Sequence, residues 1–416
     1  MISYLKGIYH YILTWFGNLI FWFPSRKIFV LGVTGTKGKS TTVELINAIL
    51  EAAGKKTALV SSLRFKIGDK TVKNTTGNTM PGRFFIQKKL RKAVNAGCQY
   101  FLMEVTSQGI LQHRHRFIDF DAVLFTNVRP EHIEAHGSFE KYRDSKVSLF
   151  RYVALRQAQG KPDKLFFIND EDLSKSYFTH AANGAGKIVY FSRESFIENE
   201  LDKGRESIGD WLSSNFNLEN AAAATAFAKS QGIEWPLIKK ALGSFKGVPG
   251  RLEYIQKEPF VVVVDYAHTP DSLEKVYQTL ISDKRHATSK KLICVLGAAG
   301  GGRDKWKRPV IGKIAAEYCD QIILTNEDPY DEDPMEILNQ IEVGIRENLR
   351  FDPRQSARIY KVLDRREAIK KAISLAKKGD AVVMTGKGSE DWMHIANGKK
   401  VPWNEKEVVE DILKIK

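Results

Sequence analysis

A glycine-rich run that contains lysines and hydroxyl residues is the strongest chemical motif in the chain. It reads Thr34-Gly35-Thr36-Lys37-Gly38-Lys39-Ser40-Thr41 and follows the apolar stretch 27–33. Glycines let backbone N–H groups converge on phosphate oxygens, and a helix beginning there adds the positive end of its dipole. Lys39 would neutralise the β- and γ-phosphates, and the Ser40 hydroxyl would bind Mg²⁺. Because Val33 stands where the usual first glycine would be, the run predicts a variant phosphate loop.

Two further groups could bind a metal ion. Glu104 ends the hydrophobic stretch 100–103, and His132 follows another strand-like run, next to Glu131 and close to His136. The carboxyl ends of parallel strands meet at one edge of a sheet, so Glu104 could hold a second Mg²⁺ there and His132 could be a ligand. Lys146 lies on an expected helix, and its spacing alone gives it no role.

The elements that must position these residues alternate between strand-like and helical segments. Strand-like runs lie at 27–33, 57–61, 100–105, 122–126 and 165–168, with helices at 39–53 and 83–96. A second series follows Gly247-Val248-Pro249-Gly250, with strands at 260–265, 292–296, 321–325 and 381–385. This alternation predicts an α/β protein: a P-loop central domain with a mostly parallel sheet, and a C-terminal Rossmann-like domain. We expect a hydrophobic N-terminal helix at 1–26, the central domain at 27–247 and the C-terminal domain at 248–416.

Composition narrows the classes of partner. The 416 residues are 43% hydrophobic, which excludes wholesale disorder, and the net charge of +15 suits a polyanion. The basic residues are spread along the chain without a nucleic-acid-binding motif, so we expect phosphorylated small molecules and no nucleic acid. The three cysteines are far apart and form no C-x-x-C pair, which argues against a disulfide scaffold and a cysteine-rich zinc site.

The N-terminal segment 1–23 is rich in aromatic and aliphatic residues. Its polar residues Lys6, His10, Thr14 and Asn18 recur every four positions and would form one narrow stripe on a helix. The segment is short for a bilayer span, and no cleavage site follows it. Two interpretations stay open: a helix packed on its own domain, or an interfacial helix at the inner membrane face. Both place the body of the protein in the cytoplasm, the second as a peripheral membrane protein.

Many motifs occur in one order from residue 28 to the C-terminus. They are Gly35–Thr41, Asn78-Thr79-Met80, Met103–Gly109, Gln112-His113-Arg114, Phe125-Thr126-Asn127, His136-Gly137, Tyr142–Lys146, Asn217–Asn220, Pro249–Glu253, Asp265–Asp271, Arg303-Asp304-Lys305 with Lys307-Arg308-Pro309, and Gly386–Glu390. With these motifs the chain resembles the Mur ligases, and among them the UDP-N-acetylmuramoyl-tripeptide synthetases of peptidoglycan synthesis. The resemblance implies an ATP- and Mg²⁺-dependent ligase that joins a free amino acid to a UDP-muramoyl-peptide-like substrate through an acyl phosphate.

The resemblance also implies roles for individual residues. Lys146 matches a carbamylated lysine, which would hold Mg²⁺ together with Ser40, Glu104 and His132. Further residues match catalytic positions: Lys39, Arg251, Asp265 and His268. ATP-binding positions are Gly35, Thr36, Lys37, Gly38, Lys39, Ser40, Thr41, Asn217 and Asn220. Positions for the muramoyl dipeptide are Asn78, Thr79, Thr106, Gln112 and Arg114. Positions for the incoming amino acid are Arg308, Glu327, Asp328, Gly386 and Glu390.

The chain departs from its family at three places, one of which is Met80-Pro81-Gly82 and Pro130-Glu131 near the substrate site. Only a short hydrophobic segment precedes the phosphate loop, where these ligases usually carry a UDP-binding domain. Diaminopimelate-adding members have Asp-Asn-Pro-Arg where this chain has Glu327-Asp328-Pro329-Tyr330, so the arginine that would pair with a carboxylate is absent. Alternatives are a folylpolyglutamate-synthetase-like or other short Mur-like ligase, and a non-catalytic membrane-associated nucleotide-binding subunit. The residues Asn78, Thr79, Gln112 and Arg114 favour the muramoyl substrate.

Overall fold

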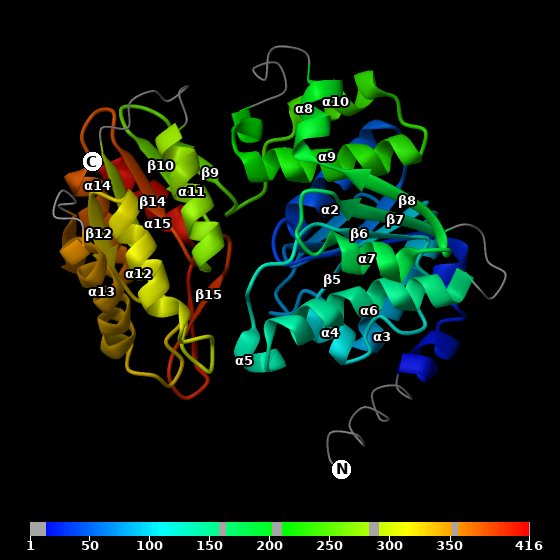
Figure 1. Ribbon diagram of the computed structural model, residues 1–416, viewed down its shortest axis with the longest axis horizontal. Coiled ribbons are helices and arrows are strands. Elements are labelled where there is room, and N and C mark those ends of the chain that lie inside the picture. The colour runs from blue at the N-terminus through cyan, green and yellow to red at the C-terminus, as the bar shows by residue number, and fades with distance from the viewer. Residues whose placement is uncertain (1–13, 158–163, 202–209, 283–290, 352–356, 416) are drawn as a thin grey trace. The chain divides into compact units, whose positions relative to one another are not determined.

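The structure of the chain is a computed structural model that describes residues 14–157, 164–201, 210–282, 291–351 and 357–415. The chain divides into two compact units. The first comprises Met1–Pro130 and His136–Lys246, and the second comprises Gly247–Lys416 together with the short segment Glu131–Ala135. The elements of both units are labelled in Figure 1.

A mixed sheet forms the centre of the first unit. In the described residues it has eight strands in the order β4-β3-β2-β5-β1-β6-β7-β8, and only β3 and β4 run antiparallel to their neighbours. The strands are β1 (Phe29–Thr34), β2 (Thr57–Val60), β3 (Arg64–Ile67), β4 (Lys70–Lys73), β5 (Tyr100–Val105), β6 (Ala122–Phe125), β7 (Lys164–Asn169) and β8 (Gly186–Phe191). The central strands are continuous apolar runs because helices cover both faces of the sheet.

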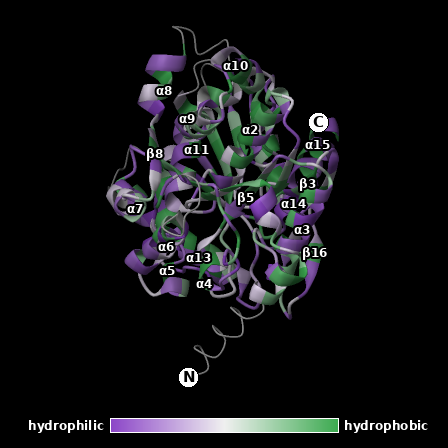
Figure 2. Ribbon diagram, turned by 90° about the vertical axis from the view of Figure 1, so that its right-hand side faces the viewer, coloured by the Kyte–Doolittle hydropathy of each residue, from purple (hydrophilic) through white to green (hydrophobic). Residues whose placement is uncertain are grey.

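Helices pack on the two faces of this sheet, as Figure 1 shows. They are α2 (Lys39–Ala52), α3 (Arg83–Asn95), α4 (Ser107–Leu111), α6 (Phe139–Gln157), α7 (Lys175–Ala182), α8 (Arg193–Glu200), α9 (Asn215–Ser230) and α10 (Trp235–Ser244), with short 3₁₀ turns η1 (Pro24–Lys27) and η3 (Asp210–Ser213). The short helix α5 (Ile133–His136) buries no residue, and its residues up to Ala135 belong to the second unit. Alternate residues of one strand enter opposite cores: Val30 packs in the core that includes α3 and α6, and Leu31 packs in the core that includes α2 and α9. Helix α2 is buried from Ser40 to Leu50 with the exception of Ala48, and its hydrophobic residues are the green parts of its ribbon in Figure 2.

The second unit contains another mostly parallel sheet. In the described residues its order is β13-β12-β11-β14-β10-β9, with β9 antiparallel at the edge. The strands are β9 (Glu253–Gln256), β10 (Val261–Val264), β11 (Leu292–Leu296), β12 (Gln321–Leu324), β13 (Arg358–Lys361) and β14 (Ala381–Met384), and a separate hairpin joins β15 (Trp392–His394) to β16 (Lys400–Pro402). The helices are α11 (Pro270–Ser282), α12 (Lys307–Tyr318), α13 (Pro334–Phe351), α14 (Arg365–Leu375) and α15 (Glu405–Ile415). One core of this unit packs Val262 and Val264 against α14 and α15.

The α/β class predicted from the sequence is confirmed, and two features were not foreseen. The antiparallel hairpin β3–β4 extends the first sheet at one edge. Cys294 in β11 and Cys319 at the end of α12 form a disulfide, whereas Cys98 is free and buried. One such cross-link is not a disulfide scaffold, but the sequence separation of 25 residues gave no signal for it. Residues 1–13, half of the predicted N-terminal helix 1–26, lie outside the described residues. Residues 14–20 are α-helical, and Pro24–Lys27 form the separate 3₁₀ turn η1.

Candidate functional site

The glycine-rich run forms a tight loop between β1 and α2. Gly35 (φ 152°) and Gly38 (φ 83°) adopt backbone conformations that disfavour other residues. Two residues after β6 hold the loop: the Lys37 N–H donates to Asn127 Oδ1 at 3.0 Å, and the Thr126 hydroxyl donates to the Lys37 carbonyl at 2.7 Å. The conformation of the loop is therefore set by the neighbouring strand as well as by its own glycines.

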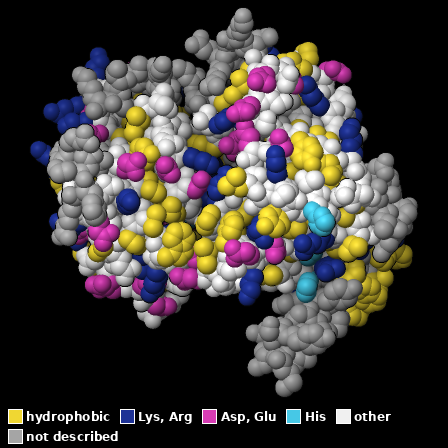
Figure 3. All heavy atoms as spheres, viewed as in Figure 1, with side chains coloured by type: hydrophobic (Ala, Val, Ile, Leu, Met, Phe, Trp, Pro, Cys, Tyr) yellow, Lys and Arg dark blue, Asp and Glu magenta, His cyan; other side chains and the backbone are white. Residues whose placement is uncertain are grey.

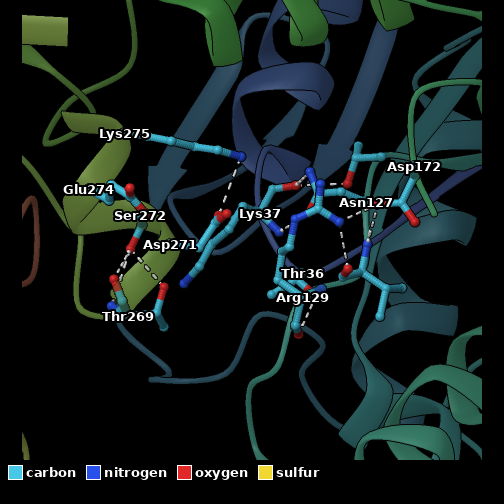
Figure 4. Close-up of polar contacts among 12 residues, drawn as sticks. Thr36, Lys37, Asn127, Arg129, Asp172, Thr269, Asp271, Ser272, Glu274 and Lys275 are labelled. Atoms are coloured by element: carbon cyan, nitrogen blue, oxygen red, sulfur yellow. Dashed lines mark hydrogen bonds and ion pairs between the residues drawn. The ribbon is translucent and has the colours of Figure 1, made fainter. Parts of the chain in front are cut away.

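Further contacts hold the loop in place, and Figure 4 draws Thr36, Arg129 and Asp172 among them. The Thr36 hydroxyl accepts from the Arg129 N–H at 3.0 Å and lies 3.1 Å from the hydroxyl of Tyr142. Arg129 in turn forms an ion pair with the buried Asp172, with 2.7 Å between Nη1 and Oδ2. No sequence pattern marks Arg129 and Asp172 as supports, because only the fold brings residues after β6 and β7 to this loop.

Helix α2 begins at this loop without a side-chain cap. No side chain accepts a hydrogen bond at its N-cap, Gly38. The N–H groups of a first helical turn have no acceptor within the helix, and they attract anions. The Lys39 ammonium lies over the same loop and donates to the carbonyls of Gly35 and Thr36, each at 2.9 Å. The residues of this loop therefore fit the phosphates of a nucleotide.

A short chain of oxygen atoms links Ser40 to Glu104. The Ser40 hydroxyl lies 2.9 Å from the Ser62 hydroxyl, and Ser62 donates to Glu104 Oε1 from its N–H at 2.8 Å and from its hydroxyl at 3.2 Å. Glu104 is buried at the end of β5, opposite Val33 of β1. Hydroxyl and carboxylate oxygens are the ligands that Mg²⁺ prefers, so this donor set fits that ion. Ser62 was missed because it lies in a loop with no motif of its own.

His132 falls in the second unit, as part of Glu131–Ala135, whereas Ser40, Glu104 and Lys146 belong to the first. Within the described ranges no three His, Cys, Asp or Glu side chains form a group that could hold a metal ion. A metal site that includes His132 stays a prediction.

Lys146 reaches the phosphate loop from α6. Its side chain is buried, and its ammonium donates to the Gly35 carbonyl at 2.7 Å, the same oxygen that accepts from Lys39. The ammonium also lies 4.5 Å from the ring centre of Tyr142. The fold therefore places Lys146 and Lys39 around one carbonyl, although 107 positions separate them in the sequence (146 − 39).

Asn217 and Asn220 lie in the first turns of α9. The Asn220 Oδ1 accepts from the Thr42 hydroxyl at 3.2 Å and lies close to the N-terminus of α2, where a Cβ atom on Gly38 would approach it to 2.3 Å. Asn217 lies three residues earlier in α9, and its Nδ2 donates to the Trp211 carbonyl at 2.6 Å. Of these two predicted adenine-side residues, the structure brings Asn220 directly to the loop.

The residues predicted to bind the muramoyl dipeptide lie near α4, which follows β5. The Thr106 hydroxyl caps α4 by accepting from the Gly109 N–H at 3.1 Å. Arg114 donates to Gln112 Oε1 at 2.6 Å and to the Met80 carbonyl, and burial lowers its pKa. The structure thus joins Gln112 and Arg114 to each other and to the segment that carries Asn78 and Thr79. Asn78 itself is exposed and donates to the Thr76 carbonyl at 3.2 Å.

In the second unit, Asp265 holds together the loops that carry Arg251 and His268. Its two carboxylate oxygens accept from the N–H groups of Leu252 at 2.5 Å and Ala267 at 2.6 Å. The Arg251 guanidinium lies 4.1 Å from the ring centre of Tyr266. His268 Nε2 lies 3.1 Å from Glu131 Oε1, and its Nδ1 lies 2.7 Å from the Tyr266 carbonyl. The Asp265 carboxylate is thus engaged in shaping the backbone around both side chains.

The loops after β12 and β14 meet through a buried lysine. Lys387 Nζ donates to Asp328 Oδ1 at 2.9 Å and to Glu390 Oε2 at 2.6 Å, and the Tyr266 hydroxyl donates to Glu390 Oε1 at 3.1 Å. Arg308, also predicted to bind the amino acid, donates instead to Glu332 at 3.0 Å, to Gln340 at 2.8 Å and to the Ala299 carbonyl at 3.2 Å. Lys387 was missed as a site residue although it stands inside the Gly386–Glu390 motif.

Glu327 is a buried carboxyl group in the same cluster. Its Oε2 has no hydrogen-bond partner among the described residues, and it lies where a Cβ atom on Gly386 would approach to 2.4 Å. Burial raises the pKa of Glu327 to about 7, against the lowering effect of Lys307 and Arg365. The buried Arg365 donates to the carbonyls of Asn326 at 3.1 Å and Thr385 at 2.7 Å, and forms an ion pair with Glu405.

Known proteins share both the sequence and the fold of this chain. The family model of the Mur ligase middle domain matches residues 33–228, and that of the Mur ligase glutamate ligase domain matches residues 250–388. A UDP-N-acetylmuramoyl-L-alanyl-D-glutamate--2,6-diaminopimelate ligase of Aquifex aeolicus (strain VF5) is 38% identical over 405 residues, which cover 94% of this chain and 78% of that protein. This chain belongs to the Mur ligase family. A ligase of the same name from Geobacillus kaustophilus (strain HTA426) is 34% identical and covers 90% of this chain and 76% of that protein.

Solved structures of Mur ligases agree with this assignment. A UDP-N-acetylmuramoyl-L-alanyl-D-glutamate--2,6-diaminopimelate ligase superposes with a TM-score of 0.59 at 26% identity, covering 93% of this chain and 78% of that one. Folylpolyglutamate synthase of Mycobacterium tuberculosis superposes with a TM-score of 0.64 at 16% identity, covering 87% of this chain and 89% of that one. At that identity the second similarity shows a shared fold alone.

Proposed function

We propose that this Mur ligase is an ATP- and Mg²⁺-dependent enzyme that joins a free amino acid to a UDP-N-acetylmuramoyl-dipeptide-like substrate in peptidoglycan precursor synthesis. One observation carries the proposal. Lys39 and Lys146 converge on the Gly35 carbonyl beside the open N-terminus of α2, in a chain 38% identical to a ligase that is named for such a substrate. Retention of Lys39, Ser40, Glu104 and Lys146 together argues against a protein that only binds nucleotide.

The reaction that we propose has two steps. A substrate carboxylate oxygen attacks the γ-phosphorus of ATP, the bond to the ADP oxygen breaks, and an acyl phosphate forms. The amine of the amino acid then attacks the acyl carbon, loses a proton, and expels phosphate, which leaves an amide. Bound Mg²⁺ would neutralise charge on the phosphate oxygens throughout.

The chain's own residues orient the reactants. The first turn of α2 and Lys39 would hold the phosphates, and Asn217 and Asn220 would bind the adenine side. Ser40 and Glu104, bridged by Ser62, would hold Mg²⁺, with Lys146 as a carbamate and His132 as further ligands. Arg251 would stabilise charge that builds on the transferred phosphate, and Asp265 and His268 would keep the surrounding loops in place. The residues Asn78, Thr79, Thr106, Gln112 and Arg114 would bind the muramoyl dipeptide.

The amino acid would bind at the loops after β12 and β14. We propose that the ionised Glu327 accepts the α-ammonium, since its Oε2 is buried without a partner. Arg308, Asp328, Gly386 and Glu390 complete the proposed set. At the position where diaminopimelate-adding members carry arginine, Tyr330 stacks on His394 with ring centres 4.8 Å apart. A phenol cannot form the bidentate pair that a guanidinium forms with a carboxylate, so we propose an amino acid without a second carboxylate, such as L-lysine.

The test combines pure protein, Mg-ATP and UDP-N-acetylmuramoyl-L-Ala-D-Glu with single amino acids, and follows phosphate release. Release that requires both the dipeptide and an amino acid supports the proposal. Release stimulated by a folate and glutamate, with none from the muramoyl dipeptide, would favour a folylpolyglutamate-synthetase-like ligase. The absence of turnover with any pair, while ATP still binds, would favour the non-catalytic nucleotide-binding subunit.

We also propose that the enzyme works in the cytoplasm and touches the inner face of the membrane through its N-terminal segment, of which residues 14–23 are described. No helix in the described residues is both long and apolar enough to span a bilayer.

A further inference from the structure

The helical residues 14–20 turn their polar side chains toward their own unit and their apolar side chains outward. Thr14 is 1% exposed and Asn18 is 4% exposed. The exposed fractions of the apolar side chains are 44% for Trp15, 47% for Phe16, 44% for Leu19, 56% for Ile20 and 77% for Trp22. A helix that simply covered a soluble domain would show the opposite arrangement. This orientation leaves an aromatic surface facing outward.

Specific contacts with α3 and α4 hold the helix in this orientation. Arg91 of α3 donates to the carbonyls of Phe21 and Trp22, each at 2.9 Å. A Cβ atom on Gly17 would lie 3.6 Å from the ring of Phe84, so the helix packs closely on α3 at that point. The Thr14 hydroxyl donates to the His113 carbonyl at 3.4 Å. The outward position of the aromatic residues therefore follows from packing on the opposite side of the helix.

Positive charges lie beside this aromatic surface, on α3 and η1. The sequence has no Asp or Glu at 1–43 or at 70–103, and α3 carries five Lys or Arg residues. Lys88 and Lys92 are exposed one helical turn apart, and Arg26 and Lys27 are exposed in η1. The charges are near enough to affect one another: burial, and then Lys92 and Lys88, lower the pKa of Lys89. In Figure 3 yellow side chains gather at the lower right, with dark blue side chains close by.

We infer that these residues form a docking surface for an anionic phospholipid bilayer, with Trp15, Phe16, Leu19, Ile20 and Trp22 in the interface and Arg26, Lys27, Lys88 and Lys92 at the headgroups. Tryptophan is the residue that membrane interfaces favour, because its ring is apolar and its N–H is polar. Basic residues beside an interfacial helix add attraction to anionic lipids. A second copy of the chain fits the surface less well, since a two-fold contact would bring the same cations together. This surface specifies the lipid for the membrane contact proposed above and is independent of the reaction that the enzyme catalyses.

The experiment is co-sedimentation of the full chain with vesicles of phosphatidylcholine that contain one-fifth phosphatidylglycerol, and with vesicles of phosphatidylcholine alone. We expect binding to the anionic vesicles that weakens in high salt, and at least tenfold weaker binding to the neutral ones. The double variant W15S/W22S should bind about 100-fold more weakly. The matched control is Leu173→Ser, since Leu173 is 94% exposed elsewhere in the same unit and its replacement should leave binding unchanged.

A charge variant tests the second part of the surface. K88E/K92E should weaken binding to anionic vesicles at least about 25-fold, because each basic residue contributes roughly fivefold. K377E/K378E changes net charge equally at two exposed lysines of the second unit and should have a much smaller effect. Urea unfolding of each variant establishes that it is folded. Equal binding of W15S/W22S and the unchanged chain overturns the inference. A second result would also overturn it: the unchanged chain does not bind vesicles and sediments as a dimer, and the W15S/W22S variant sediments as a monomer. A second copy of the chain would then cover the surface.

Discussion

Asn220 Oδ1 occupies the space beside Gly38, where an added Cβ atom would lie only 2.3 Å from it. Gly38 also has a φ of 83°, so a side chain there is disfavoured by the backbone as well as by its neighbour. The start of α2 and the start of α9 are therefore fitted to each other around the glycine.

Gly38→Ala should lower the free energy of unfolding by roughly 2–4 kcal/mol and weaken ATP binding at least about tenfold, because the phosphate loop must move. Urea denaturation and calorimetric titration with an ATP analogue measure the two effects. Gly54→Ala is the matched control: its φ is 71°, but nothing lies within 4 Å of the added Cβ, so only the backbone cost of about 1–2 kcal/mol should remain. If Asn220→Ala relieves none of the Gly38→Ala defect, steric conflict with Asn220 is not its cause.

Lys146→Ala should reduce kcat at least about 100-fold, because it removes the proposed carbamate and leaves the Gly35 carbonyl with one donor fewer. Bicarbonate or formate at tens of millimolar should restore part of the activity in the phosphate-release assay. Lys164→Ala provides the comparison, since Lys164 is equally buried but pairs with Asp119 and Asp121. That variant should lose stability without any rescue by small carboxylates. Full activity of Lys146→Ala would remove the carbamate from the mechanism.

Glu327 should make the protein less stable as pH rises. Burial raises its folded-state pKa from 4.5 to about 7, so the folded state binds this proton more tightly than the unfolded state does. The stabilising contribution is present below about pH 4.5 and is lost as pH rises through about 7. The difference between the two pKa values corresponds to roughly 3 kcal/mol.

Urea unfolding between pH 5 and pH 8 tests this expectation, with Glu327→Gln as the variant that cannot ionise. The unchanged protein should lose stability relative to Glu327→Gln over this range. Glu332→Gln serves as a control that should leave the pH profile between pH 5 and pH 8 unchanged, because a hydrogen bond from Arg308 lowers the pKa of Glu332 and its contribution is lost only below about pH 4.5. Parallel pH profiles for the unchanged protein and Glu327→Gln would contradict the assignment.

Tyr330→Arg should shift the amino-acid preference toward diaminopimelate. The guanidinium would supply the bidentate partner for a second carboxylate, and we expect kcat/KM for meso-diaminopimelate relative to L-lysine to rise about tenfold. Tyr330→Phe keeps the ring that stacks on His394 and removes only the hydroxyl that accepts from Arg303 at 3.4 Å, so it should leave the preference unchanged. Diaminopimelate as the best substrate of the unchanged enzyme would refute the proposed selectivity.

Buried strands were the part of the fold that could be predicted best from the sequence. The run Tyr100–Val105 is β5 to the residue, because a strand covered on both faces is apolar throughout. The hairpin of β3 and β4 was missed, since Arg64–Ile67 alternates polar and apolar residues and Lys70–Lys73 is mostly polar and exposed throughout, so neither is an apolar run. The spacing of Thr14 and Asn18 predicted that they share one stripe of a helix, but it did not indicate that this stripe packs against the rest of the first unit.

In the candidate site, too, some residues could be identified from a local sequence pattern and others only from the fold. Phosphate-loop residues are contiguous, so a local pattern was enough to find Lys39 and Ser40. Ser62, Arg129 and Asp172 reach the loop only through the order of the strands, and no spacing along the chain marks them. Lys146 was identified only through the family resemblance, and the fold shows that its ammonium contacts the phosphate loop at the Gly35 carbonyl.

The backbone contacts of Arg365 limit how the amino-acid specificity of the second unit can change in evolution. Its guanidinium fastens the backbone at Asn326 and at Thr385, the residues from which the two loops with Glu327 and Glu390 emerge. One buried side chain therefore fixes the backbone where both loops begin. A change in the preferred amino acid would then arise from substitution of loop side chains, while the backbone of the loops keeps its conformation. Descendants of this enzyme with different cell-wall chemistry should therefore keep Arg365 and Glu405 while the residues at 327–330 change.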